Sequence, residues 1–377
     1  MTLSQFMPLF NPTQLAEMYS LRPSASPASI QRGLELSTGL QTVPTGLTPK
    51  ELVWTKNKAR LYHYLPQVER RHKTPLLLIY ALINKPYILD LYPGNSFIEH
   101  MVKQGFEVYL LDWGDWGPED SEVSFDDLVL DYIPRAVRKV VRHSGRERVT
   151  IMGYCIGGIL TTIYTALHPD APLRNAIFMA APVDFARAGL FGCWLDPRYF
   201  PLDKALAAYG NMPGELVELG AKMLKPVTNY VTPLVNLSQR LEDDKYLQGW
   251  AAMNQWVNDR VDFPGAAFRQ LVKDLYQENK LIRGELVIGG RTVDLKNIHW
   301  PALLIAAERD HITPPTTTLP LFDHISSKEK DKLVIPAGHV GLVAGRGAIN
   351  GLWPKVSEWL AARSDGRTSS PGGRGSG

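Results

Sequence analysis

The sequence VTIMGYCIGG, residues 149–158, decides the fold of this chain. Its first four residues form a short apolar run typical of a buried strand, and a helical pattern begins at Gly157. Between them lies Gly-x-Cys-x-Gly, the pattern of a nucleophile elbow, a sharp strand-to-helix turn that presents a reactive side chain. A Cβ at Gly153 or Gly157 would clash with neighbouring backbone in such a turn. The stretch therefore predicts that Cys155 is a nucleophile.

The two cysteines of the chain have different contexts. A free cysteine is often an inert core residue, but the elbow places the sulfur of Cys155 at a helix start, which favours a thiolate. Cys193, in Phe-Gly-Cys-Trp, has no such context, and we interpret it as a packing residue. Because two cysteines are too few for a disulfide framework, we expect free thiols and a reducing compartment.

Two polar turns follow apolar runs further along the chain. Asp310 comes after the run from Ala302 to Ala306, and His339 follows the run from Leu333 to Ile335. The carboxyl ends of parallel strands meet at one edge of a sheet, so both side chains should lie where Cys155 emerges. The order nucleophile, acid, base is that of the elbow enzymes. We predict a catalytic triad of Cys155, Asp310 and His339.

Each assignment has an alternative. Glu308 is a rival acid, Asp310 alone reads as a turn residue before Pro314 and Pro315, and we interpret His311 as packing behind the site.

The oxyanion hole should use the backbone N–H of Ile156 and a second N–H from residues 81–84, for which we take Leu82. Esterases carry a His-Gly run at the latter position, and this chain does not.

Apolar runs on both sides of the elbow extend it into a sheet. Continuous rather than alternating hydrophobicity predicts strands covered on both faces, and the segments between the runs show helical spacing. Lys56-Asn57-Lys58 divides an antiparallel pair between Glu51 and Leu65. We predict an α/β class: an α/β-hydrolase fold with a mostly parallel, doubly wound sheet and an inserted helical cap. Besides those named above, the expected strands are Leu76 to Leu82, Val108 to Leu111, Val149 to Met152 and Ala176 to Ala180.

The length of 377 residues exceeds what one core usually holds, so an insertion is expected. The α/β alternation breaks between Ala181 and Pro301, where amphipathic segments such as Pro213 to Lys225 stand between prolines. The predicted units are an N-terminal arm with a helix only near residues 12–20, two parts of the core, a cap or lid between them, and a disordered tail. Their bounds are 1–48 for the arm, 49–183 and 298–363 for the core, 184–297 for the cap and 364–377 for the tail.

Composition excludes several classes of function. The chain has 41 Lys+Arg and 38 Asp+Glu, a net charge of +3, which argues against nucleic acid. No apolar run is long enough for a membrane span, and the N-terminus does not read as a secretory signal, so we expect a cytoplasmic protein. There is no phosphate loop, no dinucleotide fingerprint and no zinc spacing, and hence we expect no cofactor and no metal.

Several segments together resemble the short, two-subunit polyhydroxyalkanoate (PHA) synthases of class III or class IV. The resemblance runs from about Gly46 to Leu360, and the block FRQLVKDLYQENKLIRGELVIGGRTVDL, residues 268–295, is its most discriminating part. Other segments are GYCIGG at 153–158, YALINKPYILDLY at 80–92, VYLLDWG at 108–114, and the turns that hold Asp310 and His339.

The resemblance implies an acyltransferase that polymerises (R)-3-hydroxyacyl-CoA, chiefly 3-hydroxybutyryl-CoA, with release of CoA. It implies a covalent thioester on Cys155, with His339 and Asp310 completing the triad. It also implies a second, smaller subunit of one of two unrelated kinds, a homodimer or hetero-oligomer, and a place at PHA granules in the cytoplasm.

Two other functions fit the same residues. A thiol-dependent hydrolase would use the triad to cleave thioesters or lactones, and a non-catalytic granule-coat protein would keep only the fold. For an enzyme of this kind we expect the cap to rest largely closed, and the second subunit or the polymer to favour an open form.

Overall fold

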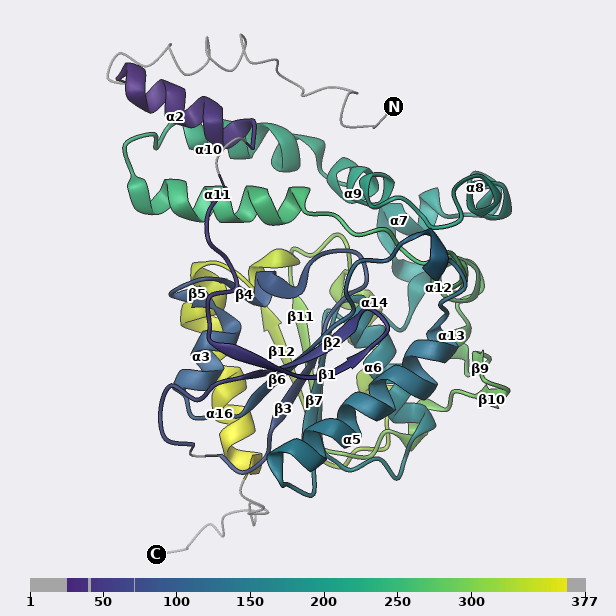
Figure 1. The fold of residues 1–377 in the computed structure, drawn as a ribbon. Coiled ribbons are helices and arrows are strands. Elements are labelled where there is room, and N and C mark those ends of the chain that lie inside the picture. The colour runs from purple at the N-terminus through teal and green to yellow at the C-terminus, as the bar shows by residue number, and fades with distance from the viewer. Residues whose placement is uncertain (1–25, 40–41, 71, 365–377) are drawn as a thin grey trace, which may run out of the picture.

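A sheet of eight strands forms the centre of the molecule, in the order β1-β2-β6-β3-β7-β8-β11-β12. The computed structural model describes residues 26–39, 42–70 and 72–364 (Figure 1). The strands from β6 to β12 are parallel, and the hairpin β1–β2 joins them antiparallel through β2 and β6. The strands are β1 Lys50–Lys56, β2 Ala59–Tyr64, β3 Leu76–Ile79, β6 Val108–Asp112, β7 Val149–Tyr154, β8 Leu173–Met179, β11 Ala302–Ala307 and β12 Lys330–Ile335. The predicted parallel sheet and hairpin are confirmed.

The inner strands are apolar because both of their faces are covered. Every residue of β3 (LLLI) and β11 (ALLIAA) is buried, as a parallel strand between two helical layers requires. The edge strand β12 (KDKLVI) is mostly exposed, and its lysines suit an unpaired edge.

Helices cover both faces of this sheet (Figure 1). On one face lie α3 (Phe97–Lys103) and α16 (Trp353–Ser364), and on the other lie α5 (Ile133–Ser144) and α6 (Ile156–Leu167). Helix α6 begins directly after Cys155, and all of its residues are buried. A wholly buried helix at this position fixes the elbow rigidly.

The segment between β8 and β11 is largely helical, as the predicted insertion requires. The predicted amphipathic stretch Pro213 to Lys225 contains α9 (Gly214–Met223). Its other elements are η5 Phe185–Arg187, α7 Gly189–Trp194, α8 Leu202–Tyr209, η6 Val227–Val231, α10 Thr232–Ser238, α11 Asp244–Asn258, α12 Gly265–Arg269, η7 Gln270–Gln277, α13 Lys280–Arg283, the short strands β9 Val287–Ile288 and β10 Arg291–Thr292, and η8 Leu295–Asn297. Its division from the core at residues 184 and 297 stays a prediction.

Smaller elements complete the first and last parts of the core. Those in the first part are η2 Pro86–Leu89, β4 Asp90–Tyr92, β5 Asn95–Ser96, η3 Pro118–Asp120, α4 Phe125–Asp127 and η4 Leu128–Tyr132. Those in the last part are α14 Pro315–Thr318, α15 Leu321–His324, η9 Val340–Leu342 and η10 Ala348–Leu352. In the described ranges, no helix combines the length and the apolar character that crossing a membrane requires.

The N-terminal arm contains a helix that the sequence reading missed. Helix α2 (Pro27–Ser37) begins at Ser26, whose hydroxyl accepts from the N–H of Ser29 at 3.1 Å, and Pro27 occupies the first helical position. It lies on α10 and α11 (Figure 1), where Leu36 packs against Leu237. The helix expected near residues 12–20 lies outside the described residues. The arm is therefore partly a helix packed on the insertion.

The predicted tail begins one residue too early. Ser364 is the last residue of α16 and is buried. Its hydroxyl accepts from the N–H of Thr74 at 3.0 Å, and its carbonyl accepts from the Thr74 hydroxyl at 2.9 Å. Hydrogen bonds rather than apolar contacts hold Ser364. The absence of apolar residues from 364 onward therefore placed the predicted start of the tail one residue too early. Residues 365–377 lie outside the described part of the chain.

Candidate active site

Cys155 occupies a strained turn between β7 and α6. Its φ of 58° and ψ of −123° lie in a region that residues with a Cβ rarely adopt. A Cβ on Gly153 would stand 2.4 Å from the carbonyl oxygen of Gly157, and a Cβ on Gly157 would stand 2.2 Å from that of Ile79. Both glycines are therefore required by close backbone, as the elbow pattern predicts.

Asp310 and His339 meet at the carboxyl edge of the sheet. They follow β11 and β12, and the His339 Nδ1 lies 2.7 Å from the Asp310 Oδ2. The other contacts of the carboxylate are the N–H groups of Ile312 and Thr313, at 2.9 and 2.8 Å, and the Thr313 hydroxyl at 2.8 Å. The side chains that contact this buried acid are Thr313 and His339, and of the two only His339 can act as a base.

The charges of Asp310 and His339 support one another. Burial works to raise the pKa of Asp310, but the charge of His339 and hydrogen bonds from His339 and Thr313 lower it below its usual range. Burial works to lower the pKa of His339, but the charge of Asp310, the charge of Cys155 and hydrogen bonds to both raise it to about 10. The surroundings of His339, with Asp310 and Cys155 on it, thus favour a protonated imidazole.

The residues considered as alternatives to the triad take no part in the contact between Asp310 and His339. Glu308 is exposed, while Asp310 is buried on His339. His311 is half-buried, and burial together with the charge of Lys225 lowers its pKa. Cys193 lies exposed on α7, so its interpretation as a packing residue was wrong. Helix α7 belongs to the insertion and has no buried residue. The apolar neighbours of Cys193 in the sequence therefore did not indicate that its side chain is buried.

Aromatic residues that the sequence reading did not single out surround the site. The Tyr154 ring stacks on the His339 ring, with centroids 5.1 Å apart, and its hydroxyl donates to the His339 carbonyl at 3.3 Å. Tyr276 belongs to the π-helix η7. Burial is the main cause that raises its pKa, and the charges of Cys155 and Asp310 raise it further. Tyr154 adjoins Cys155 and could have been noticed, but nothing in the sequence spacing points to Tyr276.

The predicted oxyanion donors lie on two neighbouring segments. Ile156 is the first residue of α6, where an N–H has no partner within the helix. The loop after β3 lies beside the elbow, because a Cβ on Gly157 would also stand 2.6 Å from the carbonyl oxygen of Tyr80. Leu82, two residues further, is buried. The N–H of Leu82 as second donor stays a prediction.

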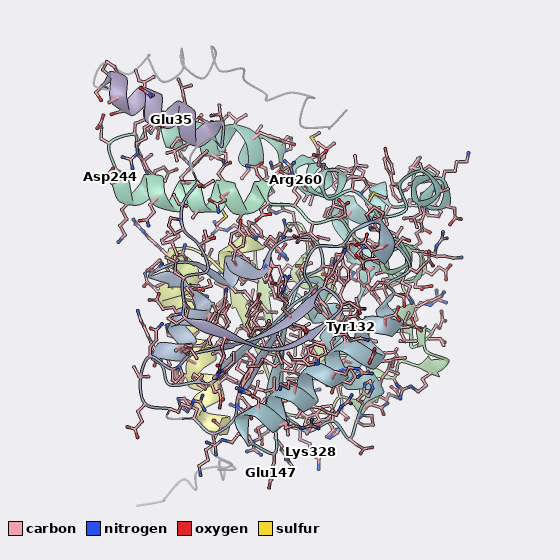
Figure 2. All side chains as sticks on the ribbon, in the orientation of Figure 1. Glu35, Tyr132, Glu147, Asp244, Arg260 and Lys328 are labelled. Carbon is pink, nitrogen blue, oxygen red and sulfur yellow. The ribbon has the colours of Figure 1, made fainter. Side chains whose placement is uncertain are left out.

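The insertion is hydrogen-bonded to this same loop. The Trp256 Nε1 at the end of α11 donates to the Lys85 carbonyl at 2.9 Å. Asn84 pairs with Arg260 as an isolated antiparallel bridge. Figure 2 labels Asp244 at the start of α11 and Arg260 just beyond its other end, where the chain meets the loop. The loop after β3 is thus held between the core and the insertion.

Two family models match the chain. The model described as "alpha/beta hydrolase fold" matches residues 74–345, which agrees with the parallel sheet and the elbow. The model described as "Poly-beta-hydroxybutyrate polymerase (PhaC) N-terminus" matches residues 41–101. Among solved structures, a monoacylglycerol lipase of Paleococcus ferrophilus aligns over 81% of this chain and 99% of its own, with 17% identity and a TM-score of 0.49.

Several curated relatives are named poly(3-hydroxyalkanoate) polymerase subunit PhaC. The protein of Haloferax mediterranei is 38% identical, over 86% of this chain and 66% of its own length. That of Synechocystis sp. is 35% identical over 88% and 89%, and that of Thiocystis violacea is 34% identical over 89% and 95%. This chain therefore belongs to the PhaC family of poly(3-hydroxyalkanoate) polymerases, as the catalytic subunit of a polymerising acyltransferase on an α/β-hydrolase fold.

Proposed function

We propose that Cys155 carries the growing hydroxyacyl chain as a thioester, with His339 as the base and Asp310 as the residue that orients it. The observation that carries this proposal is the 2.7 Å contact between Asp310 and His339, next to the strained Cys155. The proposed substrate is (R)-3-hydroxyacyl-CoA, chiefly 3-hydroxybutyryl-CoA.

In the first step, the proton of the Cys155 thiol resides on His339, whose protonated form the site favours, and the sulfur attacks the thioester carbonyl. The bond from that carbonyl to the CoA sulfur breaks, and CoA leaves with the proton from His339. A thioester replaces a thioester, so this exchange is nearly isoenergetic. The N–H groups of Ile156 and Leu82 would stabilise the oxyanion.

In the second step, the 3-hydroxyl of one hydroxyacyl group attacks the thioester carbonyl of another. His339 accepts the hydroxyl proton, a C–O ester bond forms and a C–S bond breaks, and the released thiol recovers the proton. Asp310 keeps His339 oriented and stabilises its positive charge. All of these changes occur among carbonyl, hydroxyl and thiol groups, so the scheme needs no cofactor.

Water competes with the hydroxyl at every turnover, and the site is built to exclude it. Cys155 is only 7% exposed, and Tyr276 of the insertion lies close enough for the charge of Cys155 to affect its pKa. A dry site favours polymer over hydrolysis, which would otherwise give a soluble hydroxy acid.

A second, smaller subunit is the partner that we propose for the insertion. Large apolar side chains are exposed on its elements from α7 to α10, and we call these side chains together the insertion's apolar surface. They would also face a granule in the cytoplasm. Its members are Leu190, Trp194, Tyr199, Tyr209, Leu219, Met223, Val227 and Val235. The same surface could instead form a homodimer, which is the alternative to a complex with the second subunit.

One experiment tests these proposals together. Purified protein is incubated with 3-hydroxybutyryl-CoA, with and without a candidate second subunit, while CoA release and turbidity are followed. Polymerisation gives both signals, and they should increase with the subunit. CoA release with soluble hydroxy acid would instead identify a hydrolase, and no CoA release in any mixture would contradict the proposed chemistry.

A further inference from the structure

A row of polar residues crosses three strands at the edge of the sheet that carries the hairpin. The strand register pairs Glu51 of β1 with His63 of β2, and His63 with Tyr109 of β6. Directly paired residues point to the same face, and α5 packs on that face and brings His143 to the row. Tyr109 lies near the start of β6, so this row is at the amino end of the parallel strands, away from Cys155.

Three ligand atoms of this row converge. The Glu51 Oε1 lies 2.8 Å from the His63 Nδ1 and 3.9 Å from the His143 Nε2. All three atoms lie within 4.8 Å of one another. Zn²⁺ bonds of about 2.1 Å in a tetrahedron place ligand atoms roughly 3.4 Å apart. The observed spacing is close to this value, and Glu51 and His143 are exposed enough to adjust.

The second nitrogen of each histidine already has a partner. The His63 Nε2 lies 3.4 Å from the buried Glu107 carboxylate, and the His143 Nδ1 lies 2.8 Å from the Tyr109 hydroxyl. The same Tyr109 hydroxyl donates to Glu107 at 2.8 Å. Metal-binding histidines in proteins are oriented in this way, by carboxylate or other polar partners on the nitrogen that faces away from the metal.

We propose that Glu51, His63 and His143 bind a zinc ion, with water as the fourth ligand. Imidazole and carboxylate are ligands that zinc prefers, and three protein ligands leave one open position. On binding, the Glu51–His63 hydrogen bond is replaced by two bonds to the metal. The His63 proton then resides on Nε2 and is donated to Glu107.

Arg70 is a positive side chain in direct contact with this cluster. Its Nη1 lies 3.1 Å from Glu107, and its Nη2 lies 3.2 Å from the His63 Nε2. Glu107 balances its charge, and Arg70 is exposed, so it can leave His63 and keep Glu107 when Nε2 is protonated. The ion would fasten the hairpin β1–β2 to α5, which makes it a structural site rather than a part of the reaction.

Zinc titration calorimetry on the full chain tests this proposal. Cys155→Ala and Cys193→Ser are introduced first, because free thiols would compete for the metal. We expect one saturable site per chain and a higher melting temperature with zinc. Both effects should vanish in His143→Ala, a change at an exposed position that leaves the fold intact, and persist in His299→Ala, which removes another exposed histidine.

A variant outside the ligand set separates a built site from adventitious binding. Tyr109→Phe removes the partner of His143 and should weaken zinc binding about 10- to 100-fold without removing it. Cobalt in place of zinc should give the visible bands of nitrogen and oxygen ligation. No saturable binding, or binding equal in His143→Ala and in its parent, would overturn the proposal.

Discussion

The carboxylate of Asp310 and the ring of His339 lie 2.7 Å apart although 29 positions separate them in the chain. They meet because β11 and β12 are adjacent and parallel, so the turns that follow these strands share an edge. Thr313 fixes both residues, since its hydroxyl contacts the Asp310 Oδ2 and lies 3.1 Å from the His339 Nδ1. The imidazole is thus oriented before any substrate arrives.

Cys155→Ala should abolish CoA release, and Cys155→Ser should leave a small remainder, because an alcohol is a far weaker nucleophile at neutral pH. We expect a loss of about 10³-fold or more in either variant. The rate of CoA release from 3-hydroxybutyryl-CoA measures it. Cys193→Ser, which changes the exposed thiol, is the matched control and should keep wild-type turnover. Turnover by Cys155→Ala at the wild-type rate would refute the assignment.

His339→Gln and Asp310→Asn should differ from one another. The first removes the base and should prevent acylation of Cys155, while the second leaves a base in place and should permit acylation but slow elongation. Radiolabelled substrate and denaturing gels measure acylation, and turbidity measures elongation. Glu308→Gln changes the exposed rival acid and should affect neither. Equal labelling of His339→Gln and wild type would contradict the base role.

The raised pKa of His339 has a consequence for stability. Its folded-state pKa of about 10 lies above the ordinary value of 6.5, so protonation of His339 favours the folded state. This contribution is fully present below about pH 6.5 and is lost as the pH rises through about 10. The difference in melting temperature between wild type and His339→Gln should therefore shrink from pH 6.5 to pH 10. A constant difference over that range would show that the pair does not stabilise the fold.

Truncations on either side of Ser364 should differ. Deletion of residues 365–377, which include no large apolar side chain, should leave activity and melting temperature nearly unchanged. Deletion from Ser364 also removes two hydrogen bonds to Thr74, each of about 1 kcal/mol, and should lower the free energy of unfolding by about 1–3 kcal/mol. Urea unfolding measures the free energy of unfolding of both truncated chains. Equal stability of the two truncated chains would contradict the anchoring role of Ser364.

The sequence reading succeeded where one local pattern determines the structure. The turn at Cys155 requires glycine at 153 and 157, as the pattern predicts, and the runs before Asp310 and His339 are strands, the first buried and the second at the edge of the sheet. It failed where distant parts of the chain decide the outcome. Tyr276 reaches Cys155 only through the path of the insertion, and the Glu51–His63 pair depends on strand register. Helix α2 is the exception, because Ser26-Pro27 is a local signal for the start of a helix.

The bond from Trp256 to the Lys85 carbonyl links the position of α11 to the loop after β3. If α11 moves away from the core, this bond and the Asn84–Arg260 bridge must stretch or break, and the backbone that leads to Leu82 loses its outer support. If Leu82 is the second oxyanion donor, as proposed, the position of α11 and the polarisation of the bound carbonyl belong to a single equilibrium. By thermodynamic reciprocity, a molecule that binds the displaced α11 more tightly loosens this loop, and a ligand that orders the loop draws α11 back.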